Sequence, residues 1–314
     1  MLDTPTPQKT RRIGVLLFPQ FSMHCLANAI EPLRGANTLA GQVLYEWEFL
    51  SLDGKPLQSS SGLPVTPAMP LSDHPGGDLL MIIPSYGHPD HATPATSRGL
   101  RAASKRFAHL GGFDTGSWLL AKAGLLEGYR ATIHWDVLTD LAETFPEIEV
   151  SEDRFVIDRN RISCGGASTT MELMLHLIGL HHGAMLRLEV SALFMHGERD
   201  LSATPHQRHS DDQWVEMAVS LMRRNLETPL SIPEVAAHLG ISARALEAHF
   251  AKATARTPQS TYRSLRLAAA RRLVQQTTYS IAEIGTRCGY EDPSALTRAF
   301  RKEFGTTPRA LRLS

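Results

Sequence analysis

This sequence contains few cysteines and no long hydrophobic run. The three cysteines, Cys25, Cys164 and Cys288, are odd in number and lack the spacing of metal ligands, which argues against a disulfide framework and against a metal site. No stretch approaches the roughly 18 consecutive apolar residues of a membrane span. The apolar run at 13–18 is also too short for a signal peptide. These absences predict a cytoplasmic protein in a reducing compartment, with no membrane partner.

The sequence also lacks net charge, but its charges are unevenly distributed. Residues 215–314 contain 15 Lys and Arg against 8 Asp and Glu, whereas residues 1–214 contain 17 against 24. A basic region attached to an acidic one is typical of a polyanion-binding module joined to a domain that does not touch nucleic acid. At 314 residues the chain is long enough for two or three domains.

The basic region contains one pattern twice, at 231–258 and again at 280–308. Each copy begins at Ser-Ile, passes through a glycine turn and ends at Thr-Pro. A short helix, a glycine turn and a second helix predict a helix-turn-helix, so two copies predict two recognition helices. Each second helix carries two apolar residues four positions apart, which we expect to face the core: Leu246 and Phe250 in the first copy, Leu296 and Phe300 in the second.

The opposite face of each second helix is then free to contact DNA. A recognition helix reads base edges from its first two turns, so Arg298 is expected to bond guanine and Glu247 to accept from cytosine. Arg301 and Lys302 are expected to bind phosphate. A long helix at 259–275 would hold the two recognition helices about 34 Å apart, in successive major grooves. The full set of predicted DNA-binding residues is Arg244, Glu247, Ala248, Lys252, Pro293, Ser294, Thr297, Arg298, Arg301 and Lys302.

Residues 214–312 resemble the AraC/XylS family of transcription regulators. The resemblance is carried by the stretches 280–285, 288–290 and 300–308. The first copy departs from the family twice, because Ala255 lies in a triplet where the family favours Gly and Ala248 stands where a polar base-contacting residue is common. The resemblance therefore implies duplex DNA as a partner, read more weakly by the first helix. A helix-turn-helix used for protein contacts is the alternative.

The acidic region alternates strands with helices. Strands are expected at 12–18, 45–50, 78–83, 109–113 and 131–133, helices at 23–39, 97–107, 115–123 and 135–144, then a hairpin at 154–164 and a helix from 168. Such alternation predicts a mostly parallel sheet covered on both faces. The expected organisation is an α/β domain at 11–199, a linker at 200–212 without apolar periodicity, and an all-α domain at 213–312 with two helix-turn-helix motifs.

A strand enters a helix through a glycine-flanked corner at 110–118. This is the geometry of a nucleophile elbow, which exposes one side chain at the mouth of an α/β sheet. With 121–128, 132–135 and the Glu31-Pro-Leu-Arg34 stretch, the region resembles the ThiJ/PfpI, glutamine-amidotransferase-like proteins of flavodoxin-like fold. Together with the basic region it resembles the GlxA-type regulators over nearly the whole chain. Enzymes of that superfamily carry cysteine at the elbow, where this sequence has Asp114.

Asp114 suggests a ligand site rather than a catalytic one, with no catalytic residue and no cofactor. A carboxylate at a helix N-terminus is stabilised as an anion and favours a cationic partner, and neighbouring aromatic rings would favour an alkylated ammonium group. The resemblance implies the same class, since relatives of this type respond to amines such as arginine, betaines and carnitine. Each aromatic residue could instead belong to the core, and Asp114 could simply cap its helix. The predicted ligand-binding residues are Asp114, Phe113, Trp118, Trp135, Tyr86 and Glu31.

These observations predict a transcription regulator controlled by a small amine, amino acid or betaine. The resemblance implies an activator that contacts RNA polymerase and acts as a homodimer, presenting four helix-turn-helix units to paired half-sites. One alternative is an active amidase or hydratase fused to a DNA-binding domain. A second is an architectural DNA-binding protein whose α/β domain only dimerises.

Overall fold

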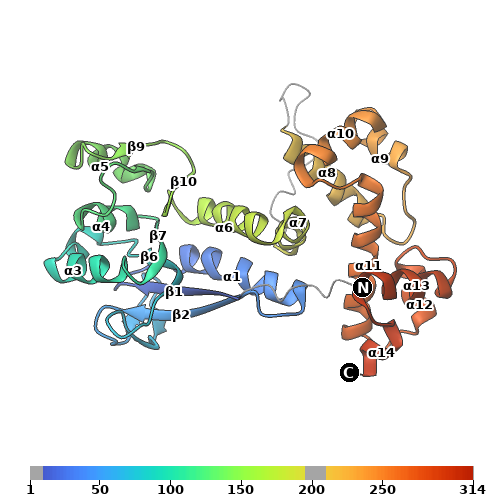
Figure 1. The fold of residues 1–314 in the computed structure, drawn as a ribbon, viewed down its shortest axis with the longest axis horizontal. Helices are drawn as coiled ribbons and strands as arrows, with labels where there is room; N and C mark the ends of the chain where they lie inside the picture. Colours follow the sequence, from blue (N-terminus) through green and yellow to red (C-terminus); the bar gives the residue numbers. More distant parts are fainter. Residues whose placement is uncertain (1–9, 195–209, 314) are drawn as a thin grey trace. The chain divides into compact units, whose positions relative to one another are not determined.

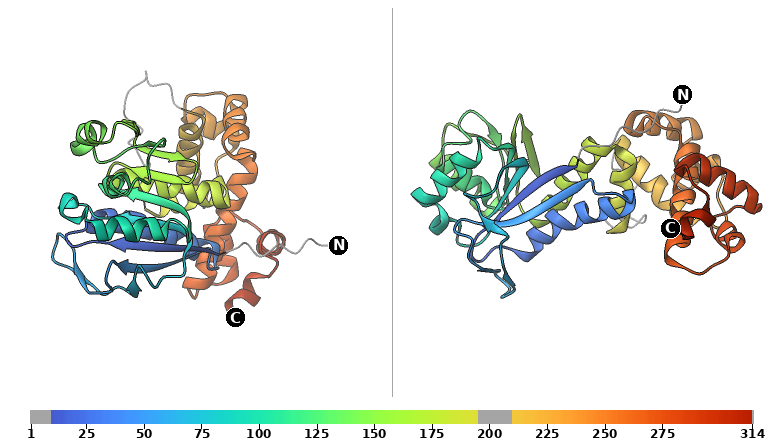
Figure 2. Two further views of the ribbon diagram at one scale, coloured as in Figure 1. Left: turned by 60° about the vertical axis from the view of Figure 1, so that its left-hand side comes forward. Right: turned by 60° about the horizontal axis from the view of Figure 1, so that its bottom comes forward.

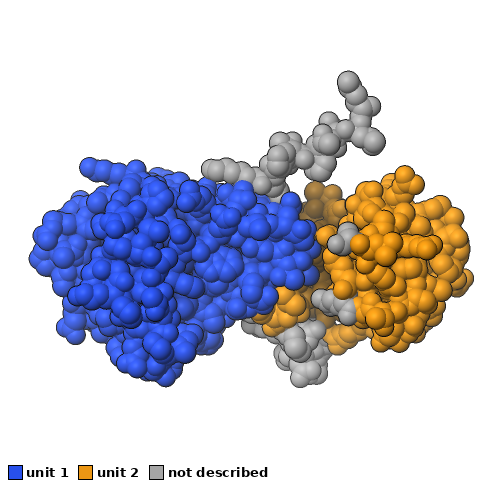
Figure 3. Space-filling view, turned by 90° about the horizontal axis from the view of Figure 1, so that it is seen from below, with its two compact units in different colours: residues 1–182 blue, residues 183–314 orange. Residues whose placement is uncertain are grey.

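The computed structural model describes residues 10–194 and 210–313. The chain divides into two compact units, Met1–His182 and Gly183–Ser314 (Figure 3). The predicted linker at 200–212 lies mostly outside the described residues, and its last two positions, 211 and 212, are helical. The helix α7 (Ala184–Leu193) belongs to the second unit, although the sequence grouped it with the first. No described helix is long and apolar enough to cross a membrane.

The first unit is built on a seven-stranded sheet. Its strand order is β10-β11-β7-β6-β1-β2-β5, and every neighbouring pair is parallel except the hairpin β10-β11. Two-stranded pairs β3-β4 and β8-β9 lie outside this sheet. The strands are β1 (Arg11–Leu17), β2 (Tyr45–Ser51), β3 (Leu57–Gln58), β4 (Pro64–Val65), β5 (Met69–Pro70), β6 (Gly77–Ile83), β7 (Phe107–Phe113), β8 (Arg130–Ala131), β9 (Glu149–Val150), β10 (Phe155–Asp158) and β11 (Arg161–Cys164).

Helices cover both faces of this sheet. The two longest, α1 and α6, pack against each other along one face, and Figure 2 shows the blue strands beside α1. The other face forms a core with α3 and α4, in which Leu80 and Leu110 of the sheet meet Leu100 and Leu119 of the helices. The predicted flavodoxin-like α/β fold is confirmed. The helices are α1 (Met23–Ala40), α2 (His88–His91), α3 (Pro94–Ala103), α4 (Gly116–Lys122), the 3-10 helix η1 (Trp135–Val137), α5 (Leu138–Thr144) and α6 (Ala167–His182).

The helix expected at 97–107 lies earlier in the chain. Thr93 caps α3 by accepting a hydrogen bond from the Thr96 amide, and Pro94 occupies the first turn, where its missing N–H costs nothing. At the other end, Phe107 is already in β7, paired with Gly77 of β6. The stretch from Phe107 onward therefore joins the sheet instead of extending the helix.

All the regular elements described in the second unit are helices, joined by turns and loops (Figure 1). It contains two separate cores: Leu246 and Phe250 lie in the first, and Leu296 and Phe300 in the second. The long helix α11 contributes to both, through Leu265 in the first and Leu267 in the second. The long helix expected between the two motifs is therefore present and belongs to both cores. The helices after α7 are α8 (Asp211–Arg224), α9 (Ile232–His238), α10 (Ala243–Thr254), α11 (Pro258–Gln276), α12 (Ile281–Arg287), α13 (Pro293–Phe304) and α14 (Pro308–Leu313).

The repeated sequence produces a repeated structure. Ser231 caps α9 and Ser280 caps α12, each accepting a hydrogen bond from an amide three residues on. Gly240 and Gly289 both follow with φ of 71°, the left-handed conformation that glycine adopts without strain. The recognition helices α10 and α13 then begin after the caps Ser242 and Asp292. Both predicted helix-turn-helix motifs are confirmed.

Candidate effector site and DNA-binding surface

The corner between β7 and α4 has the backbone of an elbow. Asp114 has a φ of 60°, in the left-handed region that residues with a Cβ rarely adopt. The glycines on either side allow the chain to turn this tightly. A Cβ on Gly116 would lie 2.2 Å from the Ile82 carbonyl oxygen, and one on Gly112 would lie 2.5 Å from the Ser117 amide nitrogen. Both positions therefore require glycine, as the spacing in the sequence suggested.

Hydrogen bonds hold the elbow from both sides. The Thr115 hydroxyl donates to the Ser85 carbonyl oxygen at 2.7 Å, and the His134 amide donates to the Asp114 carbonyl oxygen at 3.0 Å. Ser85 also has a positive φ, 52°, and its buried hydroxyl has no hydrogen-bond partner among the described residues. Two strained non-glycine residues thus meet where β6 and β7 end. Strain of this kind is concentrated at binding and catalytic sites.

The carboxylate of Asp114 is half-buried and has His88 near it. Burial lowers the pKa of His88, and the negative charge of Asp114 opposes that shift. The lowered pKa favours the uncharged imidazole at neutral pH, and Asp114 forms no ion pair with any residue that the structure describes. The His88 ring lies edge-on to Trp118, with the ring centres 5.3 Å apart. His88 was not among the predicted ligand-binding residues, although Tyr86, two residues before it, was.

The predicted aromatic residues divide into three environments. Tyr86 and Trp135 are 63% and 78% exposed, and each follows a residue that is hydrogen-bonded to the elbow, Ser85 and His134 respectively. Trp118 is half-buried between His88 and Phe145. Phe113 is fully buried, so its ring has no surface to offer a ligand, and we remove it from the predicted site.

Glu31 lies in α1, with its carboxylate engaged by a neighbour on the same helix. Arg34 donates to it at 2.7 Å through Nε and forms an ion pair at 2.6 Å through its second nitrogen. This pair raises the pKa of Arg34. The carboxylate is thus already neutralised, and a role for Glu31 in ligand binding stays a prediction.

Two cysteines lie close to the elbow although they are far from it in sequence. The sulfur atoms of Cys25 and Cys164 are 3.5 and 3.3 Å from the same Thr170 hydroxyl. Burial raises the pKa of Cys164 to about 11, and burial, Cys164 and the Asp114 charge raise the pKa of Cys25 well above its ordinary value. Both thiols are therefore protonated at neutral pH and are poor nucleophiles.

The first recognition helix, α10, presents its predicted residues to solvent. Arg244, Glu247, Ala248 and Lys252 are all exposed. Lys252 lies 3.7 Å from the Asp211 carboxylate. The same carboxylate lies 2.5 Å from His249, whose ring stacks on Trp214.

The second recognition helix, α13, is arranged differently at its start. The Asp292 side chain accepts hydrogen bonds from the amides of Ser294 and Ala295 and lies 3.6 Å from Arg298. The hydrogen bonds from these backbone amides, together with the positive charge of Arg298, lower the pKa of the Asp292 carboxyl. Thr297 is half-buried and donates to the Pro293 carbonyl oxygen at 2.9 Å. The remaining predicted residues, Pro293, Ser294, Arg298, Arg301 and Lys302, are exposed.

Comparison with known proteins identifies both parts of the chain. The model of the DJ-1/PfpI family matches residues 12–180, and a helix-turn-helix domain model matches residues 235–314. The chain is 37% identical to the HTH-type transcriptional regulator GbdR of Pseudomonas aeruginosa, over 97% of this chain and 85% of that protein. It is 33% identical to the HTH-type transcriptional regulator GlxA of Rhizobium meliloti, over 99% and 98%.

A solved structure resembles part of this chain. It is an AraC family transcriptional regulator from Pseudomonas putida, 28% identical to this chain, with a TM-score of 0.52. The likeness covers 59% of this chain and 99% of that one.

Proposed function

Because this chain belongs to the DJ-1/PfpI family, and within it to the GlxA-type transcription regulators with an AraC-type DNA-binding domain, we propose that a small amine controls its activity. The chain is a DNA-binding transcription regulator. The effector site is the surface around Asp114. The amine class, the activating sign and a dimeric assembly are parts of the proposal.

The position of Asp114 carries this proposal. Its half-buried carboxylate is fixed on a strained corner. The exposed aromatic residues Tyr86 and Trp135 directly follow Ser85 and His134, which are hydrogen-bonded to this corner. An ammonium group would satisfy the carboxylate, and rings of this kind attract alkylated ammonium through cation–π interactions. Ligands of α/β proteins also bind beyond the carboxyl ends of the sheet strands, which is where β6 and β7 reach the elbow.

The chemistry of the elbow supports a binding site over an active site. The enzymes of this superfamily carry a cysteine at the elbow, whereas this chain has a carboxylate there. The two thiols nearby have raised pKa values and are fully buried. We therefore propose that the unit binds its ligand without transforming it. An amidase or hydratase activity is the second candidate, and turnover of amides by the full-length protein would establish it.

The test uses full-length protein with a panel of arginine, betaines, carnitine and polyamines. A ligand that binds only the folded protein raises the melting temperature with the logarithm of its concentration. We expect Asp114→Asn to weaken binding of the stabilising amine by about tenfold or more, because a hydrogen bond to a charged group contributes about 1.5–3 kcal/mol. Operator binding without effector should not change.

Matched variants make this test specific. Asp140→Asn removes an exposed carboxylate whose charge also reaches His88, and it should leave amine affinity nearly unchanged. Trp135→Ala should weaken a quaternary ammonium ligand more than a primary amine if the ring contributes cation–π attraction. Normal amine affinity in Asp114→Asn would refute the proposed site.

On the DNA side, we propose that α10 and α13 read adjacent major grooves from each subunit of a dimer. The support is the shared helix α11, which enters both cores and so fixes the two motifs relative to each other. A dimer would present four such motifs to paired half-sites. Equilibrium ultracentrifugation would test whether the protein is a dimer. Footprinting on the operator would test whether each subunit protects two successive major grooves.

A further inference from the structure

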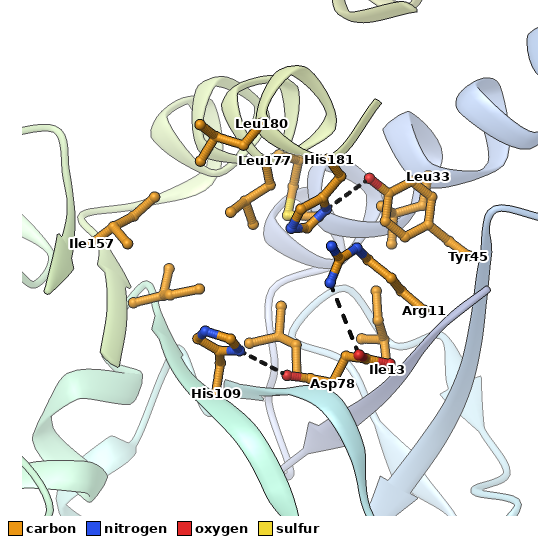
Figure 4. Close-up of a pocket in the computed structure, with 13 residues that line it drawn as sticks. Arg11, Ile13, Leu33, Tyr45, Asp78, His109, Ile157, Leu177, Leu180 and His181 are labelled. Carbon is orange, nitrogen blue, oxygen red and sulfur yellow. Dashed lines mark hydrogen bonds and ion pairs between the residues drawn. The ribbon is translucent and has the colours of Figure 1, made fainter. Parts of the chain in front are cut away.

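The first unit contains a cavity of about 130 Å³ at the edge of the sheet opposite to Asp114 (Figure 4). Arg11 and Tyr45, the first residues of β1 and β2, line it, and so does Asp78 near the start of β6. Asp114 instead follows the last residue of β7. The cavity is therefore a separate site, which the proposed function does not use.

Most of the cavity wall is apolar. Ile13 of the sheet, Leu33 of α1 and Leu177 of α6 face it. Figure 4 shows Leu177, Leu180 and Ile157 on one side and Arg11 toward the middle. An apolar cavity of about 150 Å³ accepts a molecule the size of benzene. The space here therefore suits a short branched or aromatic group.

One charged group in this wall is poorly satisfied. The guanidinium of Arg11 lies 3.9 Å from the Asp78 carboxylate, which is too far for a hydrogen bond, and it makes no side-chain hydrogen bond with any residue that the structure describes. Asp78 is better satisfied, because its carboxylate also accepts the Arg12 amide at 2.9 Å. The side chain of Arg11 is 34% exposed, so a ligand can reach it.

The two histidines at the cavity add hydrogen-bonding groups. His181 lies 3.0 Å from the Tyr45 hydroxyl, and its burial together with the Arg11 charge lowers its pKa to about 4. His109 lies 3.1 Å from the Asp78 carbonyl oxygen. Since a carbonyl oxygen only accepts, the facing nitrogen of His109 carries the proton. Arg11 is thus the permanent cation among the cavity residues.

We propose that this cavity binds a small carboxylic acid with an apolar tail. The carboxylate pairs with the Arg11 guanidinium, whose planar group matches a carboxylate with two parallel hydrogen bonds. The tail occupies the space between Ile13, Leu33 and Leu177. Leu180 and His181 belong to the last turn of α6, which ends where the second unit begins in the chain. The acid would therefore contact the last turn of α6, just before the second unit begins in the chain.

The test measures binding of 3-methylbutanoate to the full-length protein by calorimetry and thermal shift. The control ligand is 3-methylbutanamide, which has the same shape without the charge. We expect the acid to raise the melting temperature with the logarithm of its concentration, and the amide to bind about tenfold or more weakly. Equal binding of acid and amide, or no binding of the acid, would overturn the proposal.

Substitutions locate the site. Arg11→Met should weaken acid binding by about tenfold or more, whereas Arg11→Lys, which keeps the charge but not the planar group, should have a smaller effect. Arg12→Met is the matched control, because neighbouring strand residues point to opposite faces and Arg12 lies near His74 instead. Unchanged acid affinity in Arg11→Met overturns the proposal. Loss of acid binding in Asp114→Asn would also overturn the proposal, because it would show that the acid binds at the elbow. The amine proposal is tested separately, by the amine affinity of the same variant.

Discussion

Ala255 ends the first recognition helix in a conformation that is unfavourable for a residue with a Cβ. Its φ is 53°, and it forms the left-handed C-cap of α10. The equivalent cap of α13 is Gly305, with a φ of 73°. The departure from the family pattern noted in the sequence thus falls on a position where glycine has a physical advantage.

Replacing Ala255 with glycine should stabilise the protein. The left-handed conformation costs a residue with a Cβ roughly 1–2 kcal/mol, and glycine avoids this cost. Part of the resulting gain in stability is lost because glycine has greater conformational freedom in the unfolded chain. We expect Ala255→Gly to raise the free energy of unfolding by about 1 kcal/mol, measured by urea denaturation.

Gly305→Ala is the reciprocal change. A Cβ at Gly305 would meet no atom within 4 Å, so any loss of stability comes from the backbone conformation alone. The loss should be similar in size to the gain at Ala255. Destabilisation by Ala255→Gly would show that the alanine side chain contributes more than its conformation costs.

The residues of the elbow could be predicted only in part. Asp114 was found because glycines on both sides of a strand end are a local signal. Cys25, Cys164 and Thr170 converge nearby only after α1, β11 and α6 have packed together, and no local pattern reports that. Phe113 was wrongly assigned because the sequence does not say whether a ring beside an elbow faces solvent or the core.

At the scale of elements, the two recognition helices start from different contacts. Asp292 holds Arg298 at 3.6 Å near the first turn of α13, whereas Asp211 binds Lys252 and His249 in the later turns of α10. A guanidinium held near the helix start is suited to reading a base. This difference supports a larger contribution to specificity from the second motif.

Arg298→Ala should change sequence preference more than overall affinity. If Arg298 bonds guanine, its loss costs about 1–3 kcal/mol at one base position and relaxes the preference there. Arg301→Ala should instead weaken binding to all sequences equally. It should also reduce the slope of log K against log salt concentration by about 1. Binding measured across single-base operator variants at two salt concentrations separates the cases. An equal loss of affinity for all operator variants would show that Arg298 contacts phosphate and does not read a base.

The strands and long helices were predictable because their apolar periodicity is local. The helix at 23–39 and the strand at 78–83 were predicted to within one residue of α1 and β6.

The sequence did not indicate that α7 belongs to the second unit. Its Leu188 packs in the first core of the second unit, and its Arg187 pairs with Glu216 of α8 at 3.0 Å. Such long-range contacts determine which unit a helix joins, and periodicity does not encode them.

For the whole molecule, the function requires that the effector and the operator influence each other. The acidic first unit carries the proposed effector sites, and the basic second unit carries the DNA-reading helices. If an amine changes the affinity of the protein for its operator, thermodynamic linkage requires the operator to change the affinity for the amine by the same factor. Coupling of this kind is typically 5–150-fold.

We therefore expect the amine that most stabilises the protein to bind with a different Kd when operator DNA is present. The measurement is calorimetric titration of the amine into full-length protein, alone and with saturating operator. A scrambled duplex of equal length controls for charge. The ratio of the two Kd values should equal the ratio of operator affinities with and without the amine. If the amine alters transcription while both ratios stay at one, the effector acts after DNA binding, by changing how the bound regulator contacts RNA polymerase.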